Sequence, residues 1–248
     1  MVSEVKKDGA LITRWVADSP VSFPTVIFGD YVDEVSSVKV KKMDGTEVPV
    51  TIHIDRQSLA DTTKAAEVEE SGGEVVRLVA VYDLKVSRRK AKDFVDQAAN
   101  ALNLYSKIFG ADYPYGKLDL VNDPLGGFYG QAPSSLVYLG NPDFWGKGVV
   151  SGGLEAGASL SRFQDSVVAH EVAHQWWGSM ISNVNDENYW FVESLAEYSS
   201  ALYTEARYGK EKYLEHVAEW RKDILEADIR GSVQESYTVW QGPGGIRT

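Results

Sequence analysis

The chain has 248 residues, of which 44% are hydrophobic and 25% are charged, a composition typical of a globular protein with a sizeable core. Its net charge of −11, with no basic run longer than the triplet at residues 88–90, excludes nucleic acid and anionic membrane surfaces as expected partners. The absence of cysteine excludes disulfides, thiol catalysis and cysteine-ligated zinc, so any zinc would need histidine and carboxylate ligands.

The first part of the chain predicts β-strands. Runs rich in β-branched residues cover 10–17, 24–29, 35–42, 47–54 and 75–86. Asp44 and Gly45 predict a hairpin turn between the third and fourth of these runs. His53 lies on the opposite side of the fourth run from its apolar residues, so we expect it to face solvent. Residues 55–74 are polar and acidic and predict an excursion from the strands.

From Ser87 the apolar residues recur at helical spacing, which predicts a helix that is capped by Ser87 and ends at Gly110. Two short strands are then expected on either side of a stretch rich in glycine and proline, residues 123–133. Two helices follow near residues 189–208 and 211–227, and His216 in the second is expected at the surface. This order of elements predicts an α+β fold.

The stretch HEVAHQWWG, residues 170–178, contains the pattern H-E-x-x-H. Residues four apart on a helix share a face, so His170 and His174 can direct their imidazoles at one metal ion. Glu171 lies one step round the helix, close enough to contact a ligand of that metal without binding the metal itself. Gly178 is expected to end this helix. The alternative interpretation is an apolar helix that carries two structural histidines.

A catalytic zinc site needs a third protein ligand and one open position. Glu193, in the stretch YWFVESLAEY, lies near the start of the next predicted helix, after the loop that follows His174. Glu197 lies one turn further along the same face. The alternative is a pair of solvated glutamates on an outer face. Against this alternative, Trp190 and Ala201 share the face, so the face is not plainly polar.

These motifs resemble those of the gluzincin aminopeptidases, the family of aminopeptidase N and leukotriene hydrolase. HEVAHQWWG is similar to the family's H-E-[IL]-A-H-Q-W-[FW]-G, and YWFVESLAEY is similar to its W-L-N-E-G-F-A-E-Y. ADYPYGKLDLVNDP, residues 111–124, resembles the family's Y-P-x-x-K-L-D-L-V-x-x-P. The matches cover about residues 90–205.

The resemblance implies a thermolysin-like zincin catalytic domain, with a mixed β-sheet lobe followed by a helical lobe. It implies one Zn²⁺ per chain, bound by His170, His174 and Glu193, and peptide-bond hydrolysis by a metal-activated water with Glu171 as general base. Glu197 would orient a ligand histidine. The chain would then be a zinc metallopeptidase of aminopeptidase type that acts on peptides.

The sequence departs from the family at two points. The family carries an exopeptidase motif G-x-M-E-N beside the zinc, whose glutamate pairs with the free α-amine of the substrate. Here the corresponding substrate-binding residues are Gly130, Gln131 and Ala132, and Ala132 stands where the glutamate should be. The family's transition-state motif Y-x-K-G is also absent, since the late tyrosine, Tyr237, has a different context.

Two alternatives to an aminopeptidase therefore stay open: a zinc endopeptidase or oligopeptidase without the amine anchor, and a non-catalytic zinc module that binds peptide. Glu171 argues against the second, because a module that only binds needs no general base. We expect residues 1–35 to be the tail of an amino-terminal β domain or the first strands of the sheet lobe. Residues 36–248 would be the catalytic domain, truncated at its carboxyl-terminal end and weakly active by itself.

The sequence contains no apolar run of about eighteen residues and no amino-terminal hydrophobic segment, so we expect a soluble chain with no membrane-spanning segment and no signal peptide. We expect a monomer. The compartment, the side-chain specificity and the choice between exo- and endopeptidase activity do not follow from the sequence.

Overall fold

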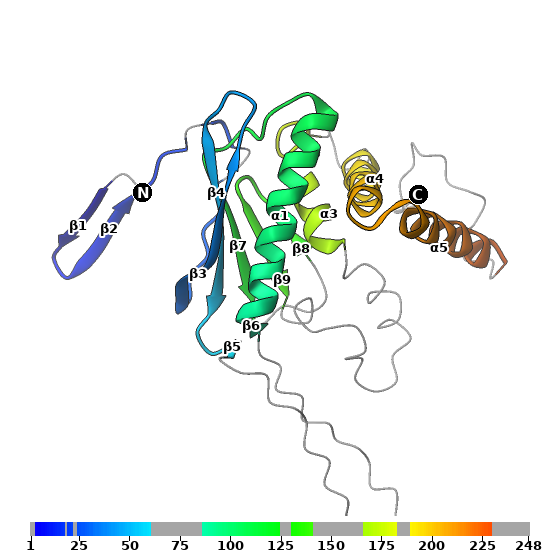
Figure 1. The fold of residues 1–248 in the computed structure, drawn as a ribbon. Coiled ribbons are helices and arrows are strands. Elements are labelled where there is room, and N and C mark those ends of the chain that lie inside the picture. Colours follow the sequence, from blue (N-terminus) through cyan, green and yellow to red (C-terminus); the bar gives the residue numbers. More distant parts are fainter. Residues whose placement is uncertain are drawn as a thin grey trace, which may run out of the picture.

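The computed structural model describes residues 3–17, 19–21, 24–60, 86–124, 130–140, 166–182 and 189–229. Its strands are β1 (Ser3–Lys7), β2 (Ala10–Arg14), β3 (Tyr31–Lys41), β4 (Glu47–Asp55), β5 (Leu59–Ala60), β6 (Val86–Ser87), β7 (Leu118–Asp123), β8 (Gly130–Gln131) and β9 (Leu136–Gly140). Its helices are α1 (Arg88–Phe109), α3 (Val167–Ala173), α4 (Tyr189–Tyr208) and α5 (Lys210–Ile229). Strands β1–β6 are followed by α1, then by strands β7–β9 and then by the remaining helices, which confirms the expected α+β fold (Figure 1).

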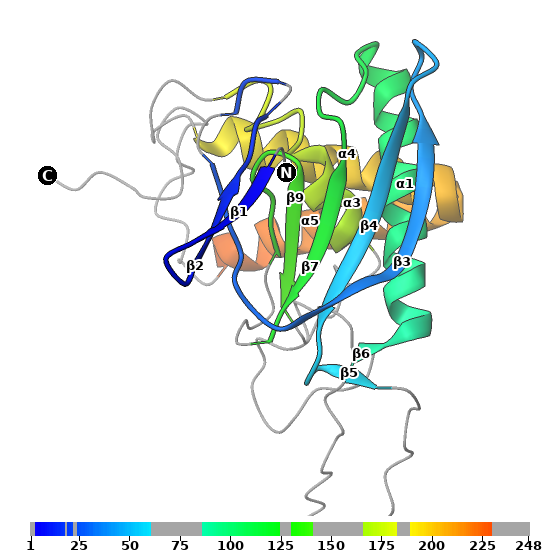
Figure 2. The same ribbon diagram turned by 90° about the vertical axis from the view of Figure 1, so that its left-hand side faces the viewer.

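The central sheet is mixed, with the strand order β3-β4-β7-β9-β8 in the described part of the chain. β3 and β4 form an antiparallel hairpin, β4, β7 and β9 run parallel, and β8 pairs antiparallel with β9. The helices cover one face of this sheet, and the β1–β2 hairpin lies on the other side (Figures 1 and 2). Among the described strands β8 is therefore the edge strand, and it lies against α3.

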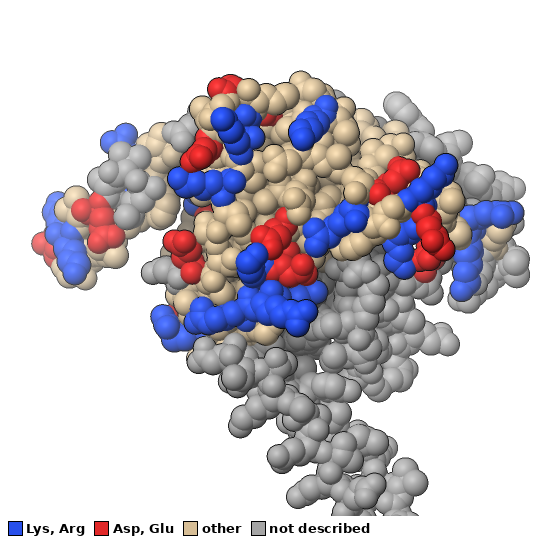
Figure 3. Space-filling model, viewed as in Figure 1, with Lys and Arg blue, Asp and Glu red and all other residues tan. Residues whose placement is uncertain are grey.

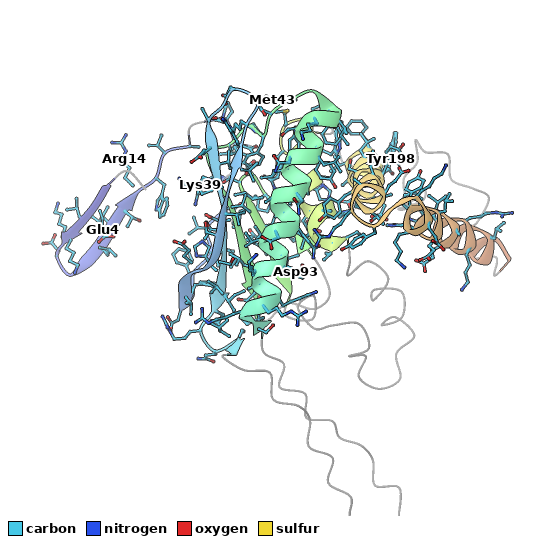
Figure 4. All side chains as sticks on the ribbon, in the orientation of Figure 1. Glu4, Arg14, Lys39, Met43, Asp93 and Tyr198 are labelled. Carbon is cyan, nitrogen blue, oxygen red and sulfur yellow. The ribbon has the colours of Figure 1, made fainter. Side chains whose placement is uncertain are left out.

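The core fills the space between the sheet and α1 (Figure 4). β4 alternates buried and less buried residues, so its inner face carries Val48, Val50, Ile52 and Ile54, each at most 1% exposed. His53 points to the outer face, as expected, where its Nε2 lies 3.6 Å from a carboxylate oxygen of Asp119.

Helix α1 begins and ends where the sequence predicts. The Ser87 hydroxyl accepts a hydrogen bond from the backbone N–H of Lys90, and Gly110 adopts the left-handed conformation, with φ 65°, that ends the helix. On the core side of α1, the Tyr105 hydroxyl donates to the carbonyl of Ala169 at 3.0 Å. This bond ties α1 to the helix that carries the two histidines.

The structure corrects two details of the strand prediction and confirms a third. Residues 24–29 were expected to form a strand and do not. β8 appears within the stretch that was expected to be a loop. The Asp44-Gly45 turn is confirmed, since the backbone N–H of Lys42 donates to the Thr46 carbonyl across it. Most of the run 75–86 and of the excursion 55–74 lies outside the described residues.

Basic and acidic side chains are interspersed over the described part of the face drawn in Figure 3. None of the described helices combines the length and the apolar character that crossing a bilayer requires.

Candidate metal centre

Helix α3 brings His170 and His174 together. The two residues lie one helical turn apart, and their ring centroids are 4.8 Å apart in an edge-to-face arrangement. The Nε2 atoms of the two rings approach to 3.1 Å. The turn after α3 ends at Gly178, whose φ of 113° lets the backbone N–H of Ser179 reach the carbonyl of His174.

Helix α4 supplies the third group. The Glu193 carboxylate lies 3.4 Å from Nε2 of His170 and 3.6 Å from Nε2 of His174. One ligand atom from each of the three residues fits within 4.8 Å of the others, a cluster that could hold a metal ion. The Glu193 side chain is 40% exposed, whereas the histidine side chains are 20% and 12% exposed, so the cluster opens to solvent on the glutamate side.

The other nitrogen of each imidazole is engaged by a protein acceptor. Nδ1 of His174 lies 3.0 Å from the carbonyl oxygen of Trp177, and Nδ1 of His170 lies 3.0 Å from Oε2 of Glu197. A carbonyl or an ionised carboxylate can only accept, so both Nδ1 atoms carry the proton. In the neutral rings, both Nε2 atoms then present lone pairs to each other and to a carboxylate. Because all of these groups present lone pairs to one another, they require a cation between them.

In the metal-free chain a proton can meet that requirement. Burial lowers the pKa of His170, but hydrogen bonds with Glu193 and Glu197 outweigh it and raise the pKa to about 10. Burial raises the pKa of Glu197, but hydrogen bonds from His170 and His216 outweigh it and lower the pKa to about 2. The cluster therefore holds a proton strongly.

The Glu171 side chain lies against Gly130 of β8 and is 6% exposed. Burial raises the pKa of its carboxyl group, and the charges of His170 and His174 oppose that effect. A Cβ atom placed on Gly130 would lie 2.1 Å from Oε1 of Glu171 and 2.3 Å from its Cδ. The glycine in β8 thus leaves the space that the carboxylate occupies.

The three residues expected to bind substrate lie beside the cluster on and after β8. Gly130 contacts Glu171, Gln131 is exposed, and Ala132 is partly buried against the core. Gln175, fully buried, ties this segment to the residues that follow α3: its Oε1 accepts from the backbone N–H of Ser135 at 2.8 Å, and its Nε2 donates to the Pro133 carbonyl at 3.2 Å.

Two residues of the site were missed by sequence reasoning. His216 was expected at the surface, but its side chain is 11% exposed and its Nε2 lies 3.0 Å from Oε1 of Glu197. Trp220, one turn along α5, donates its indole N–H to the same oxygen at 3.1 Å. The sequence did contain a signal for them, because residues four apart on a helix share a face and His216 therefore lies on the same face as Trp220. Tyr237 lies outside the described residues.

The domain described as the peptidase family M1 domain matches residues 152–241. Among curated proteins, the human endoplasmic reticulum aminopeptidase 2 is 26% identical over 154 residues, which are 62% of this chain and 16% of that protein. A probable aminopeptidase 2 from Sulfurisphaera tokodaii is 31% identical over 142 residues, covering 55% of this chain and 16% of its own length. The chain thus spans about a sixth of the length of these relatives.

Among solved structures, a mutant of an M1 zinc metallopeptidase from Deinococcus radiodurans has a TM-score of 0.59 with 17% sequence identity. The likeness covers 96% of this chain and 42% of that one. At this identity the likeness concerns the fold, and it agrees with the expected mixed sheet lobe followed by helices.

Proposed function

We propose that this chain, whose residues 152–241 match the peptidase family M1 domain, binds one zinc ion through His170, His174 and Glu193 and hydrolyses peptide bonds. One observation carries the proposal. Two imidazole lone pairs and a carboxylate converge on one point, while the far nitrogen of each ring is held by a protein acceptor.

The donor set fits zinc. Two neutral imidazoles and one carboxylate form a common ligand set of catalytic zinc, whereas magnesium and calcium prefer oxygen ligands alone. Three protein ligands leave room for a further ligand, and the exposed Glu193 side gives access to it. Bound zinc would supply Lewis acidity, which acidifies water at the site and polarises the carbonyl of the scissile bond.

Glu171 would act as the general base. It would take a proton from the attacking water and deliver it to the nitrogen of the leaving amine. Its raised pKa suits this double role, because a carboxyl group whose pKa lies nearer the working pH both accepts and returns a proton readily. Gly130 supports the role, since any larger residue there would collide with the carboxylate.

β8 offers a place for an extended peptide. Within the described part of the sheet β8 pairs only with β9, so its other edge can pair with a substrate strand through backbone hydrogen bonds. β8 lies against α3, and its residue Gly130 lies beside Glu171. A peptide bound along β8 would thus cross the general base and the metal cluster.

The position of Ala132 favours a second candidate, a peptidase that does not require a free α-amine. The relatives named above are aminopeptidases, and a carboxylate at this position would anchor the amine of their substrates. Here the side chain is a methyl group packed against the core, which offers no charge to an ammonium group. An endopeptidase or oligopeptidase therefore stays open beside an aminopeptidase.

Metal analysis combined with variants tests the proposal. We expect one zinc per chain after reconstitution, a weaker affinity in Glu193→Ala, and retained zinc with lost peptide hydrolysis in Glu171→Gln. His53→Gln is the matched control, because it changes a histidine on the outer face of the sheet and should leave zinc affinity unchanged. A chain that takes up no zinc, or a Glu193→Ala variant with unaltered affinity, would contradict the ligand set.

A further inference from the structure

Glu197 joins the metal cluster to the last described helix. Its Oε2 receives the Nδ1–H of His170 on α3, and its Oε1 receives N–H donors from His216 and Trp220 on α5. The carboxylate thus has one oxygen directed at α3 and the other directed at α5. Helix α5 packs mainly against α4, so these bonds are its link to the metal site.

The two α5 donors are arranged to act together. His216 and Trp220 lie one turn apart, and their rings meet edge to face with centroids 4.8 Å apart. The indole N–H can only donate, so Oε1 of Glu197 must accept from it. Two donors converging on one oxygen fix the plane of the carboxylate, whose terminal torsion is otherwise soft in a glutamate.

We propose that His216 and Trp220 are positioning residues of the metal centre, acting through Glu197. By fixing the carboxylate they hold His170 in the tautomer with Nδ1–H, and so keep its Nε2 lone pair directed at His174 and Glu193. Both residues donate to Glu197, which is not itself one of the three candidate ligands. The inference rests on the proposed function in assuming that the cluster binds zinc, and it adds that α5 sets how tightly the zinc is held.

Zinc affinity of the full chain tests the inference. Trp220→Phe removes the indole N–H but keeps a ring, and His216→Leu removes the second donor. Each should weaken zinc binding by about 10- to 100-fold, the range found for such outer partners of metal ligands. His216→Gln keeps a donor and should restore most of the affinity. Trp15→Phe, at a tryptophan 62% exposed and away from the site, is the matched control and should change nothing.

A double-mutant cycle identifies the route. If α5 acts through Glu197, then Trp220→Phe should have little further effect in a Glu197→Gln background. The visible spectrum of the cobalt-substituted chain should shift in Trp220→Phe, because the orientation of His170 changes, and not in Trp15→Phe. Hydrogen exchange on the unaltered chain provides a measurement without variants: zinc should slow exchange in α5, since coupling between two sites is reciprocal.

The outcomes separate this inference from the proposed function. Unchanged zinc affinity in both Trp220→Phe and His216→Leu overturns the positioning role while leaving the zinc ligands intact. So does a Trp220→Phe variant that weakens zinc binding as much in the Glu197→Gln background as in the original chain. Hydrogen exchange in α5 that does not change when zinc is added also overturns it. If zinc affinity depends on Trp220, His216 and Glu197 as expected but the chain hydrolyses no peptide, the proposed function is contradicted and the inference is supported. Failure of the unaltered chain to bind zinc would overturn both.

Discussion

Replacing Gly130 by alanine should disable Glu171 without disturbing the metal ligands. The added Cβ would lie 2.1 Å from Oε1, 2.3 Å from Cδ and 2.5 Å from Cγ of Glu171. Ordinary contacts of a Cβ atom begin near 3.4 Å, so the carboxylate must retreat by about 1.3 Å. Because Cδ and Cγ collide as well as the oxygen, rotation of the carboxylate alone cannot relieve the clash.

A displacement of this size is large for a proton-transfer group. A misplacement of about 1 Å at a reacting centre can cost about 100-fold in rate, which corresponds to about 2.7 kcal/mol. Overpacking should also lower the free energy of unfolding by about 1–3 kcal/mol. Zinc affinity should stay within about threefold of the original, since Glu171 is not in the ligand set.

Hydrolysis of a fluorogenic peptide by the zinc-loaded chain, with zinc affinity measured in parallel, tests this reasoning. Gly45→Ala is the matched control: its φ of 89° makes alanine costly for the fold, but the glycine lies in the β3–β4 turn away from the site. It should lose stability and keep activity per folded molecule. Turnover by Gly130→Ala close to the original, or a loss that persists undiminished in a Glu171→Gln background, would refute the argument.

Four further outcomes are expected. Glu193→Ala should weaken zinc binding by more than about 100-fold, exceeding the usual effect of an outer partner, whereas Glu171→Gln should leave it nearly unchanged in the same chelator competition. In the metal-free chain the pKa of His170, raised from 6.5 to about 10, contributes stability that is complete below pH 6.5 and is lost as the pH rises toward 10. Thermal unfolding should show this decline, and His170→Gln should lack most of it. Blocking the α-amine of a peptide should change kcat/KM by less than about tenfold, because Ala132 offers no charged partner to the amine. A larger loss, as expected when a buried charged pair worth about 2–5 kcal/mol is broken, would indicate that another carboxylate binds the amine. Gln175→Leu should destabilise the chain by about 1–3 kcal/mol, since it removes the side-chain acceptor of the partly buried Ser135 N–H, and a melting temperature equal to the original would count against that.

The local elements of the fold followed from the sequence. The N-cap at Ser87, the left-handed residue at Gly110 and the end of α4 before Gly209 all lie where predicted. Each depends on the properties of a few neighbouring residues, such as a hydroxyl that can accept from the first turn or a glycine that tolerates a positive φ. The strand predicted at residues 24–29 failed, because a β-branched run forms a strand only where a partner is available. The domain boundary at residue 35 stays a prediction.

The sequence by itself also determined the candidate metal ligands, since His170 and His174 share a helix face by spacing alone, and the resemblance named Glu193 as their partner. Only the tertiary structure decided that the three converge and that Trp177 and Glu197 engage the far nitrogens of the rings. Only it decided that the His216 side chain is 11% exposed, rather than at the surface, and that Gly130 leaves room for Glu171. Helical period fixes which residues of one element share a face, but which faces meet depends on packing between elements distant in the chain, which no local pattern records.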